Sequence, residues 1–174
     1  MKRLAILPLA LTSLPSLEAL AGPPAFRGAE GFGAITTGGR GGKLIKVNTL
    51  AASGPGSLQA ALDTPGPRTV VFTVSGVIPG GRTIPYGDLT LAGQTVPGAG
   101  ITLAGRLYAA YDADVGNIIV RHLRIRPTPG GSDGSQFDAA RFSLGSRVVL
   151  DHVSVSWGID ECVDLYEARD ITVS

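Results

Sequence analysis

Two short apolar runs fill the stretch Ile118-Ile-Val-Arg-His-Leu-Arg-Ile125, and the same arrangement returns at Val148-Val-Leu-Asp-His-Val-Ser-Val155. A third pair of runs, Leu89–Leu91 and Ile101–Leu103, precedes these two at a similar interval. Repeats at intervals of about 20–50 residues are typical of stacked architectures. We therefore expect a parallel β-helix, in which each turn of chain lays its strands on the previous turn, about 4.8 Å away.

Other segments of the chain also have the length and composition of strands, and they are bounded by Gly, Pro, Asn and Asp. These segments are Lys43–Val47, Thr69–Val74 and Ile171–Val173. After residue 21 no long apolar run has helical period, and a short helix is expected only at Ser57–Leu62, with Ser57 as its N-cap. The alternative fold is a β-sandwich, which requires Asn-Gly or Asp-Gly hairpin turns, and Asp133-Gly134 is the only such pair in the chain.

Composition and charge exclude several classes of protein. Hydrophobic residues make up 44% of the 174 residues, which excludes a disordered chain. The 15 basic and 14 acidic residues give a net charge of +1 without a basic run, so we expect neither a nucleic-acid partner nor a membrane partner. The single cysteine, Cys162, excludes an internal disulfide framework.

Residues 1–21 have the features of a signal peptide. A short basic start, Met1-Lys-Arg3, precedes an apolar stretch from Leu4 to Leu14, and Ala19-Leu-Ala21 offers a small-x-small cleavage site. A transmembrane anchor is disfavoured because Pro8, Pro15 and Glu18 interrupt a segment shorter than about 20 residues. We therefore predict a secreted protein in which residues 22–174 form the N-terminal part of one folded domain.

Six blocks of sequence, in order along the chain, carry a family resemblance. They are Ala25–Ala34, Thr37–Gly42, Ser53–Leu58, Leu91–Ile101, Asn117–Pro127 and Leu150–Glu161. Together they resemble the pectate lyases of the first polysaccharide lyase family. The resemblance implies an all-β, right-handed parallel β-helix with a short N-terminal capping helix at Ser57–Leu62, and further turns beyond Ser174.

The resemblance also implies an activity, a cofactor and a substrate. The family cleaves polygalacturonate, an acidic polysaccharide of the plant cell wall, by β-elimination with Ca²⁺. The proton on C5 of the uronate is a poor acid, and a cation that stabilises negative charge makes its removal easier. We therefore expect a secreted calcium-dependent pectate lyase, monomeric when complete.

Three aspartates are the predicted metal ligands. Asp160 and Asp164 are four residues apart, so they would point to one face of a regular strand. The offset from Asp138 to Asp160 is close to one turn of the repeat. By resemblance, Asp138, Asp160 and Asp164 match the calcium-binding acids of the family. Glu161 is the alternative to Asp160 if the register differs by one residue.

The resemblance places the family's catalytic arginine beyond the segment that matches Val153–Tyr166. We therefore assign no catalytic residue within the 174 residues, and expect the chain alone to be a weakly active fragment. One alternative is a non-catalytic secreted β-helix module that binds acidic polysaccharide. A second is a lyase or hydrolase of the same fold that needs no metal, because fold does not determine function.

Three further residues have both a structural and a functional interpretation. Asp151 and His152 are adjacent, so in a strand they would face opposite sides, and we interpret them as structural rather than as an acid–base pair. Trp157 follows an apolar run, which favours a place in the core over a sugar-stacking surface.

Overall fold

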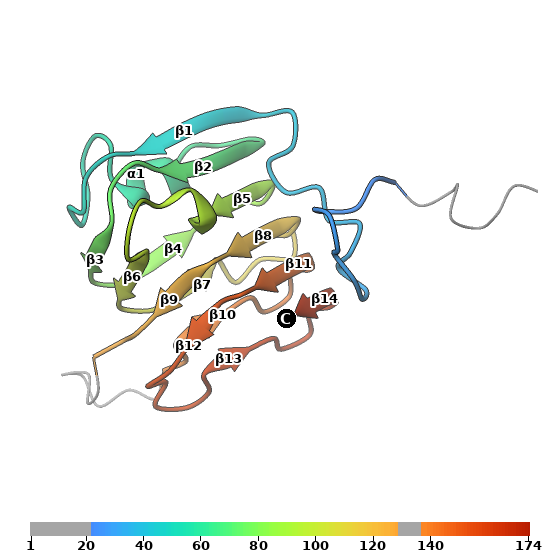
Figure 1. The fold of residues 1–174 in the computed structure, drawn as a ribbon. Coiled ribbons are helices and arrows are strands. Elements are labelled where there is room, and N and C mark those ends of the chain that lie inside the picture. Colours follow the sequence, from blue (N-terminus) through green and yellow to red (C-terminus); the bar gives the residue numbers. More distant parts are fainter. Residues whose placement is uncertain (1–21, 129–136) are drawn as a thin grey trace, which may run out of the picture.

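A computed structural model of the protein describes residues 22–128 and 137–174. The predicted signal peptide and the Asp133-Gly134 pair lie outside these ranges. All strand pairs are parallel and form three sheets, which Figure 1 shows stacked turn upon turn. The first sheet consists, in spatial order, of β1 (Lys43–Val47), β2 (Arg68–Phe72), β5 (Leu89–Ala92), β8 (Ile118–Arg121), β11 (Ser146–Asp151) and β14 (Arg169–Val173).

The other two sheets have four strands each. The second sheet contains β3 (Gly76–Pro79), β6 (Ile101–Ala104), β9 (Leu123–Ile125) and β12 (Ser154–Val155). The third sheet contains β4 (Arg82–Ile84), β7 (Leu107–Ala109), β10 (Ala140–Arg141) and β13 (Val163–Asp164). From β2 onward, consecutive strands belong to different sheets, and every pair joins strands of neighbouring turns in parallel. The prediction of a parallel β-helix is therefore confirmed and the β-sandwich is excluded.

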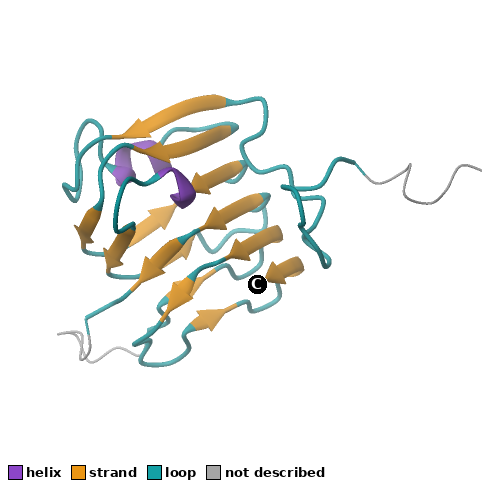
Figure 2. Cartoon of the chain, in the orientation of Figure 1, coloured by secondary structure: helices purple, strands orange, loops and turns teal. Residues whose placement is uncertain are grey.

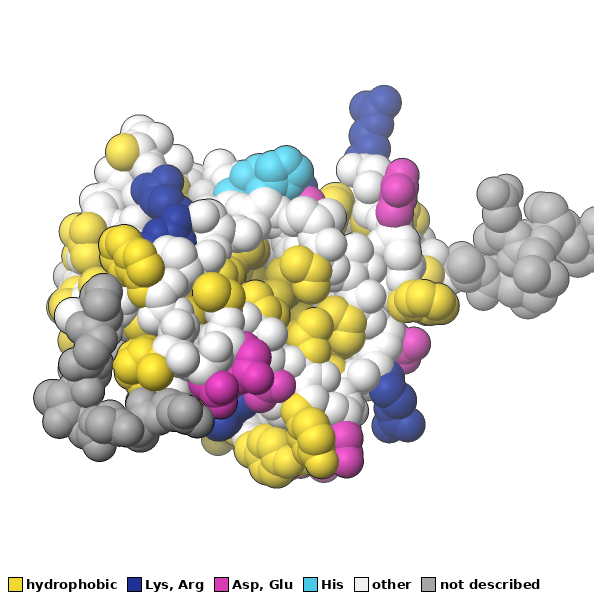
Figure 3. Space-filling model, turned by 90° about the horizontal axis from the view of Figure 1, so that it is seen from below, with side chains coloured by type: hydrophobic (Ala, Val, Ile, Leu, Met, Phe, Trp, Pro, Cys, Tyr) yellow, Lys and Arg dark blue, Asp and Glu magenta, His cyan; other side chains and the backbone are white. Residues whose placement is uncertain are grey.

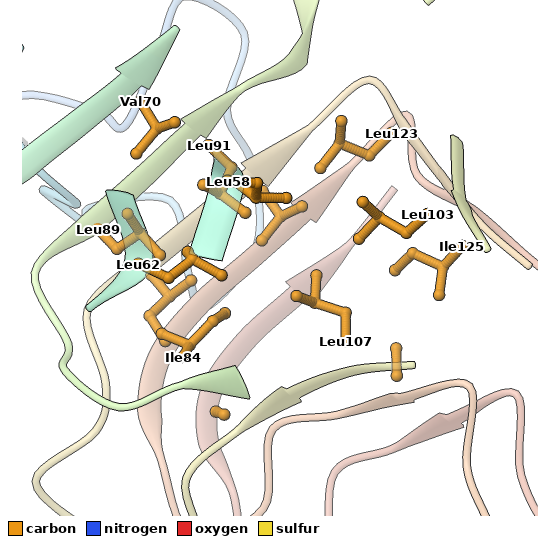
Figure 4. Close-up of a cluster of buried hydrophobic side chains, with 14 of the residues drawn as sticks. Leu58, Leu62, Val70, Ile84, Leu89, Leu91, Leu103, Leu107, Leu123 and Ile125 are labelled. Carbon is orange, nitrogen blue, oxygen red and sulfur yellow. The ribbon is translucent and has the colours of Figure 1, made fainter. Parts of the chain in front are cut away.

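Apolar side chains of successive turns stack into a linear core. Val70, Leu91, Val120 and Leu150 come from four neighbouring strands of the first sheet and lie in register. All four are buried, and Figure 4 shows Val70 and Leu91 among the labelled side chains of this core. Leu89, Ile118 and Val148, two residues earlier on β5, β8 and β11, form a second buried row in register, so the first sheet directs two rows of side chains into the core.

A short helix, α1 (Leu58–Leu62), lies at the end of the stack where β1 is the outermost strand, as Figure 2 shows. The Ser57 hydroxyl accepts a hydrogen bond from the Ala60 N–H, as an N-cap does, and Leu58 and Leu62 are buried against the core. The helix contacts β1 and β4, the end strands of two sheets. The predicted capping helix is therefore confirmed, because it covers the otherwise exposed apolar end of the core.

Arg68, at the start of β2, joins the helix to the first turns. Its side chain is fully buried, and its guanidinium donates five hydrogen bonds, all to backbone carbonyls. The acceptors are the carbonyl oxygens of Ala61, Leu62, Gly66, Tyr86 and Gly87. Burial lowers the pKa of Arg68 from its ordinary value, while the charges of Asp88 and Asp63 act in the opposite direction.

The chain between residue 22 and β1 runs along the first sheet and is tied to several of its turns. Thr37 and Gly38 donate their N–H groups to the side-chain oxygen of Asn117, and Gly33 donates to the Thr172 hydroxyl.

A short 3₁₀ helix, η2 (Gly93–Thr95), follows β5. Among the described residues, no helix has the length and apolar character needed to cross a bilayer.

Candidate metal centre

Three acidic side chains meet at the end of the stack opposite α1. Oxygen atoms of Asp138, Asp160 and Glu161 all lie within 4.8 Å of one another. The Asp138 side chain is buried, whereas Asp160 and Glu161 are exposed, so the group opens to solvent on one side. Figure 3, which views the end formed by β12 and β13, shows acidic side chains gathered on this face.

The pairing of β10 with β13 brings this acidic group together. Ala140 lies in register with Val163, so Asp138 and Glu161, each two residues earlier, lie at matching positions on neighbouring turns. The Ala139 N–H donates to the Glu161 carbonyl at 3.0 Å. The Glu161 N–H points to the Asp138 carboxylate at 3.4 Å. Backbone pairing therefore holds the two carboxylates side by side.

Asp160 reaches the group from a bend rather than from a strand. The N–H groups of Ile159 and Asp160 both donate to the Phe137 carbonyl, which folds residues 158–160 toward Asp138. Gly158 permits this bend, because a Cβ there would clash with the Glu161 carbonyl oxygen. The expectation that Asp160 and Asp164 share one strand face is wrong, since β13 begins only at Val163.

Asp164 lies on β13, in register with Arg141 of β10, and the three-residue group does not include it. One of its carboxylate oxygens accepts the Ser143 hydroxyl at 2.9 Å. The other accepts the Tyr166 N–H at 2.8 Å. The structure therefore brings together two of the three predicted ligands, Asp138 and Asp160, adds the alternative acid Glu161, and gives Asp164 hydrogen-bond partners of its own.

Mutual repulsion sets the electrostatics of the acidic group. A hydrogen bond with Asp138, together with partial desolvation and the charge of Asp160, raises the pKa of Glu161 above its ordinary value. Like charges at such distances disfavour full ionisation, and a bound cation relieves this repulsion. Carboxylate oxygens are the ligands that Ca²⁺ prefers, so the donor set fits that ion.

Arginine and tyrosine side chains lie next to the acids on the outer face of the third sheet. Tyr108 of β7 donates its hydroxyl to the Asp138 carbonyl at 2.9 Å. The Arg141 guanidinium lies 4.3 Å from the centre of the Tyr108 ring. Arg106 lies 5.1 Å from the ring centres of both Tyr108 and Phe137. Sequence reasoning missed these residues, although the alternation from Arg106 to Ala109 marks a strand.

Trp157 precedes the bend that carries Asp160. Its side chain is 56% exposed and its backbone is left-handed, with φ of 69°. The expectation that Trp157 belongs to the core is therefore wrong, because the chain has left β12 at Val155 and the ring turns outward. An exposed indole beside a group of polar side chains has the geometry of a surface that can stack on a sugar ring.

Known proteins resemble this chain over most of its length. No protein-family model matches the chain. The chain is 44% identical over 168 residues to a probable pectate lyase C of Aspergillus fumigatus, covering 95% of this chain and 39% of that protein. It is 44% identical over 138 residues to a probable pectate lyase C of Aspergillus flavus, covering 79% of this chain and 32% of that protein. The chain thus spans less than half the length of these curated relatives.

A solved structure shows the same fold. The crystal structure of Jun a 1, the major allergen from cedar pollen, superposes with a TM-score of 0.62 over 87% of this chain and 54% of that chain. The two sequences are 20% identical over this superposition, so the likeness concerns the fold.

Proposed function

Since the chain is a homologue of proteins named pectate lyase C, we propose that it is part of a secreted polysaccharide lyase and carries its calcium-binding acids. The proposed substrate is polygalacturonate, the acidic polymer of the plant cell wall. The observation that carries this proposal is the meeting of Asp138, Asp160 and Glu161 within 4.8 Å on the face that also presents Arg141 and Tyr108.

The proposed reaction is a β-elimination. A base removes the proton on C5 of a galacturonate, the electron pair forms the C4–C5 double bond, and the glycosidic oxygen on C4 leaves and is protonated. The difficulty is the low acidity of the C5 proton, which the negative uronate carboxylate worsens. When bound, Ca²⁺ would supply a Lewis acid that draws the negative charge developing next to that carboxylate.

The residues of this chain would act by binding and orientation. Asp138 is buried and fixed by the strand pairing, so its carboxylate is preorganised, whereas the exposed Asp160 can adjust to an ion. Ca²⁺ takes six to eight oxygens, so three protein carboxylates leave positions for a substrate carboxylate and water. Arg106 and Arg141 supply the positive charge that a polyuronate needs beside the acids.

The third carboxylate of the site is either Glu161 or Asp164. Glu161 lies in the acidic group, whereas Asp164 is the acid expected from the family resemblance and would have to release Ser143 or Tyr166. A matched pair of variants, Glu161→Gln and Asp164→Asn, distinguishes the two. The variant that removes a ligand weakens calcium binding by about tenfold or more, and the other leaves it within about twofold of the parent.

Calcium titration of the chelator-treated chain tests the proposal. We expect calorimetry to detect calcium binding, and Asp138→Asn to abolish it. Asp63→Asn, which removes an exposed acid at the opposite end of the stack, is the control and leaves binding unchanged. Retention on immobilised polygalacturonate should require calcium. Equal retention with calcium and with chelator, or unchanged calcium affinity in Asp138→Asn, would refute the assignment.

Secretion is tested separately, by expression of the whole precursor. We propose that residues 1–21 direct export and are removed after Ala21. Amino-terminal sequencing of the protein recovered from the medium should begin at Gly22. An exported protein that still begins at Met1 would contradict the proposed cleavage site.

A further inference from the structure

The chain has two histidines, and the fold places them in contact, away from the acidic group. His122 follows β8 and His152 follows β11, one turn further along the stack. Their ring centres lie 4.7 Å apart, with 23° between the ring planes. Figure 3 shows the two imidazoles together at the surface.

The backbone explains this contact. Arg121 of β8 lies in register with Asp151 of β11, and the His122 N–H donates to the Asp151 carbonyl at 3.1 Å. Both histidines have left-handed backbones, with φ of 54° for His122 and 53° for His152, where the chain turns from the first sheet to the second. The same turn on two neighbouring levels therefore projects both imidazoles outward, one above the other.

This turn also overturns the expectation that Asp151 and His152 face opposite sides. The strand ends at Asp151, and the left-handed residue after it brings the His152 Nδ1 atom to 2.9 Å from the Asp151 Oδ1 atom. Strand alternation does not extend past the end of a strand, so it does not separate these two side chains.

Asp151 is built to hold His152 in one orientation. Its side chain is almost fully buried, and its second oxygen accepts the Arg121 Nε–H at 2.6 Å. The Ser174 hydroxyl donates to Oδ1 at 3.1 Å. Burial by itself would raise the pKa of Asp151, but the hydrogen bonds from Arg121, His152 and Ser174 outweigh it and lower the pKa below its ordinary value. Asp151 is therefore a carboxylate at neutral pH.

A carboxylate only accepts hydrogen bonds, so the Nδ1 atom of His152 carries the proton and Nε2 keeps a free lone pair. Hydrogen bonding of one imidazole nitrogen to a carboxylate is the usual way in which a metal-binding histidine is oriented. The His122 ring, stacked on His152, also offers an imidazole nitrogen, and burial together with the positive charge of Arg121 lowers its pKa from the ordinary value.

We propose that His122 and His152 bind a divalent transition-metal ion of the Zn²⁺, Ni²⁺ and Cu²⁺ class, with Asp151 as the residue that orients His152. Imidazole nitrogens suit these ions, whereas Ca²⁺ prefers oxygen, so this site and the acidic group select different metals. The remaining positions around the ion would hold water or a small ligand.

The geometry needs only a small adjustment. Two Zn–N bonds of about 2.0–2.1 Å at a tetrahedral angle require nitrogens about 3.3 Å apart. Ligand atoms of His122, Asp151 and His152 already lie within 4.8 Å of one another. The His152 side chain is 66% exposed, so its ring can tilt from the stacked arrangement without disturbing the core.

Zinc titration of the chain, purified without an affinity tag, tests the proposal. The parent and every variant carry Cys162→Ser, because the exposed thiol of Cys162 is of a type that binds zinc and would add a second binding site. Calcium at a saturating concentration is present throughout, so that the acidic group does not compete. We expect one zinc ion per chain at pH 7.5, and weaker binding in acid, where protons compete with the metal for its ligands.

Single replacements assign the ligands. His122→Asn and His152→Asn are chosen because asparagine tolerates the left-handed backbone at both positions, and circular dichroism checks that each variant folds. Each should weaken zinc binding at least tenfold, and the double variant should abolish it. Asp138→Asn, in the acidic group, should leave zinc binding unchanged. A folded parent that binds no zinc, or a double variant that binds like the parent, would overturn the proposal.

Discussion

Replacing Arg68 by methionine should destabilise the protein by an amount that its hydrogen bonds allow us to work out. Methionine fills a similar apolar length but donates nothing, so five carbonyl oxygens lose their donor. The bonds to Gly66, Tyr86 and Gly87 are only partly buried, and water can replace the guanidinium there. The bonds to Ala61 and Leu62, the last turn of α1, are buried.

Two buried carbonyls without a donor cost about 1–3 kcal/mol each, which gives about 4 kcal/mol for Arg68→Met. A chain of this size loses about 2–4 °C in melting temperature for each kcal/mol, so we expect a drop of about 8–16 °C. The assay is urea and thermal unfolding followed by circular dichroism. Arg40→Met is the matched control, since Arg40 is exposed although it also donates to backbone carbonyls, and it should cost less than about 1 kcal/mol.

A loss below about 1 kcal/mol in Arg68→Met would refute the reasoning. It would mean that water reaches the carbonyls of Ala61 and Leu62, and hence that α1 does not seal the end of the core. Arg68→Lys refines the result, because lysine keeps the charge but has three donors on one nitrogen and cannot reproduce the planar arrangement. It should recover only part of the lost stability.

Three further perturbations have defined outcomes. Leu91→Ala removes a fully buried link in the core of the first sheet and should cost about 2–5 kcal/mol in urea unfolding. Gly158→Ala places a methyl group against the Glu161 carbonyl oxygen, so it should displace the acidic group and weaken calcium binding, measured by calorimetry, by about tenfold. Unchanged affinity would show that calcium binding does not depend on the bend. The lowered pKa of Asp151 contributes stability that is present above the ordinary carboxyl range and is lost as the pH falls through the folded-state pKa. Asparagine cannot titrate, so the free energy of unfolding should fall less between pH 6 and pH 3 in Asp151→Asn than in the parent.

The β-helix could be predicted from sequence because its signal is repeated. The pairs at Ile118–Ile125 and Val148–Val155 mark the first and second sheets, and both occur where expected. The strands of the third sheet were missed: Ala140–Arg141 and Val163–Asp164 are only two residues long, and the other two are only three residues long. Pairs this short leave no alternation to detect, and neighbouring turns rather than local propensity make them strands.

The sequence also predicted only part of the candidate metal centre. The acids of the candidate metal centre were predicted from the sequence, but Glu161 rather than Asp164 lies beside Asp138 and Asp160 in the structure. The deciding feature is the bend at Gly158, which removes Asp160 from the strand. Nothing in the spacing of the acids alone indicates where a strand of two residues begins.

Both groups of candidate metal ligands arise because equivalent positions of successive turns stack on one another, yet their spacings in the sequence differ. Asp138 and Glu161 are 23 residues apart, whereas Arg121 and Asp151, which flank the histidine pair, are 30 apart. A single repeat length therefore cannot find both groups, since connections of different length separate the sheets on each turn. The register of each sheet therefore has to be determined separately. Residues inserted in a connection between two strands lengthen the sequence distance between the residues on either side of them, but they leave the contact between neighbouring turns unchanged.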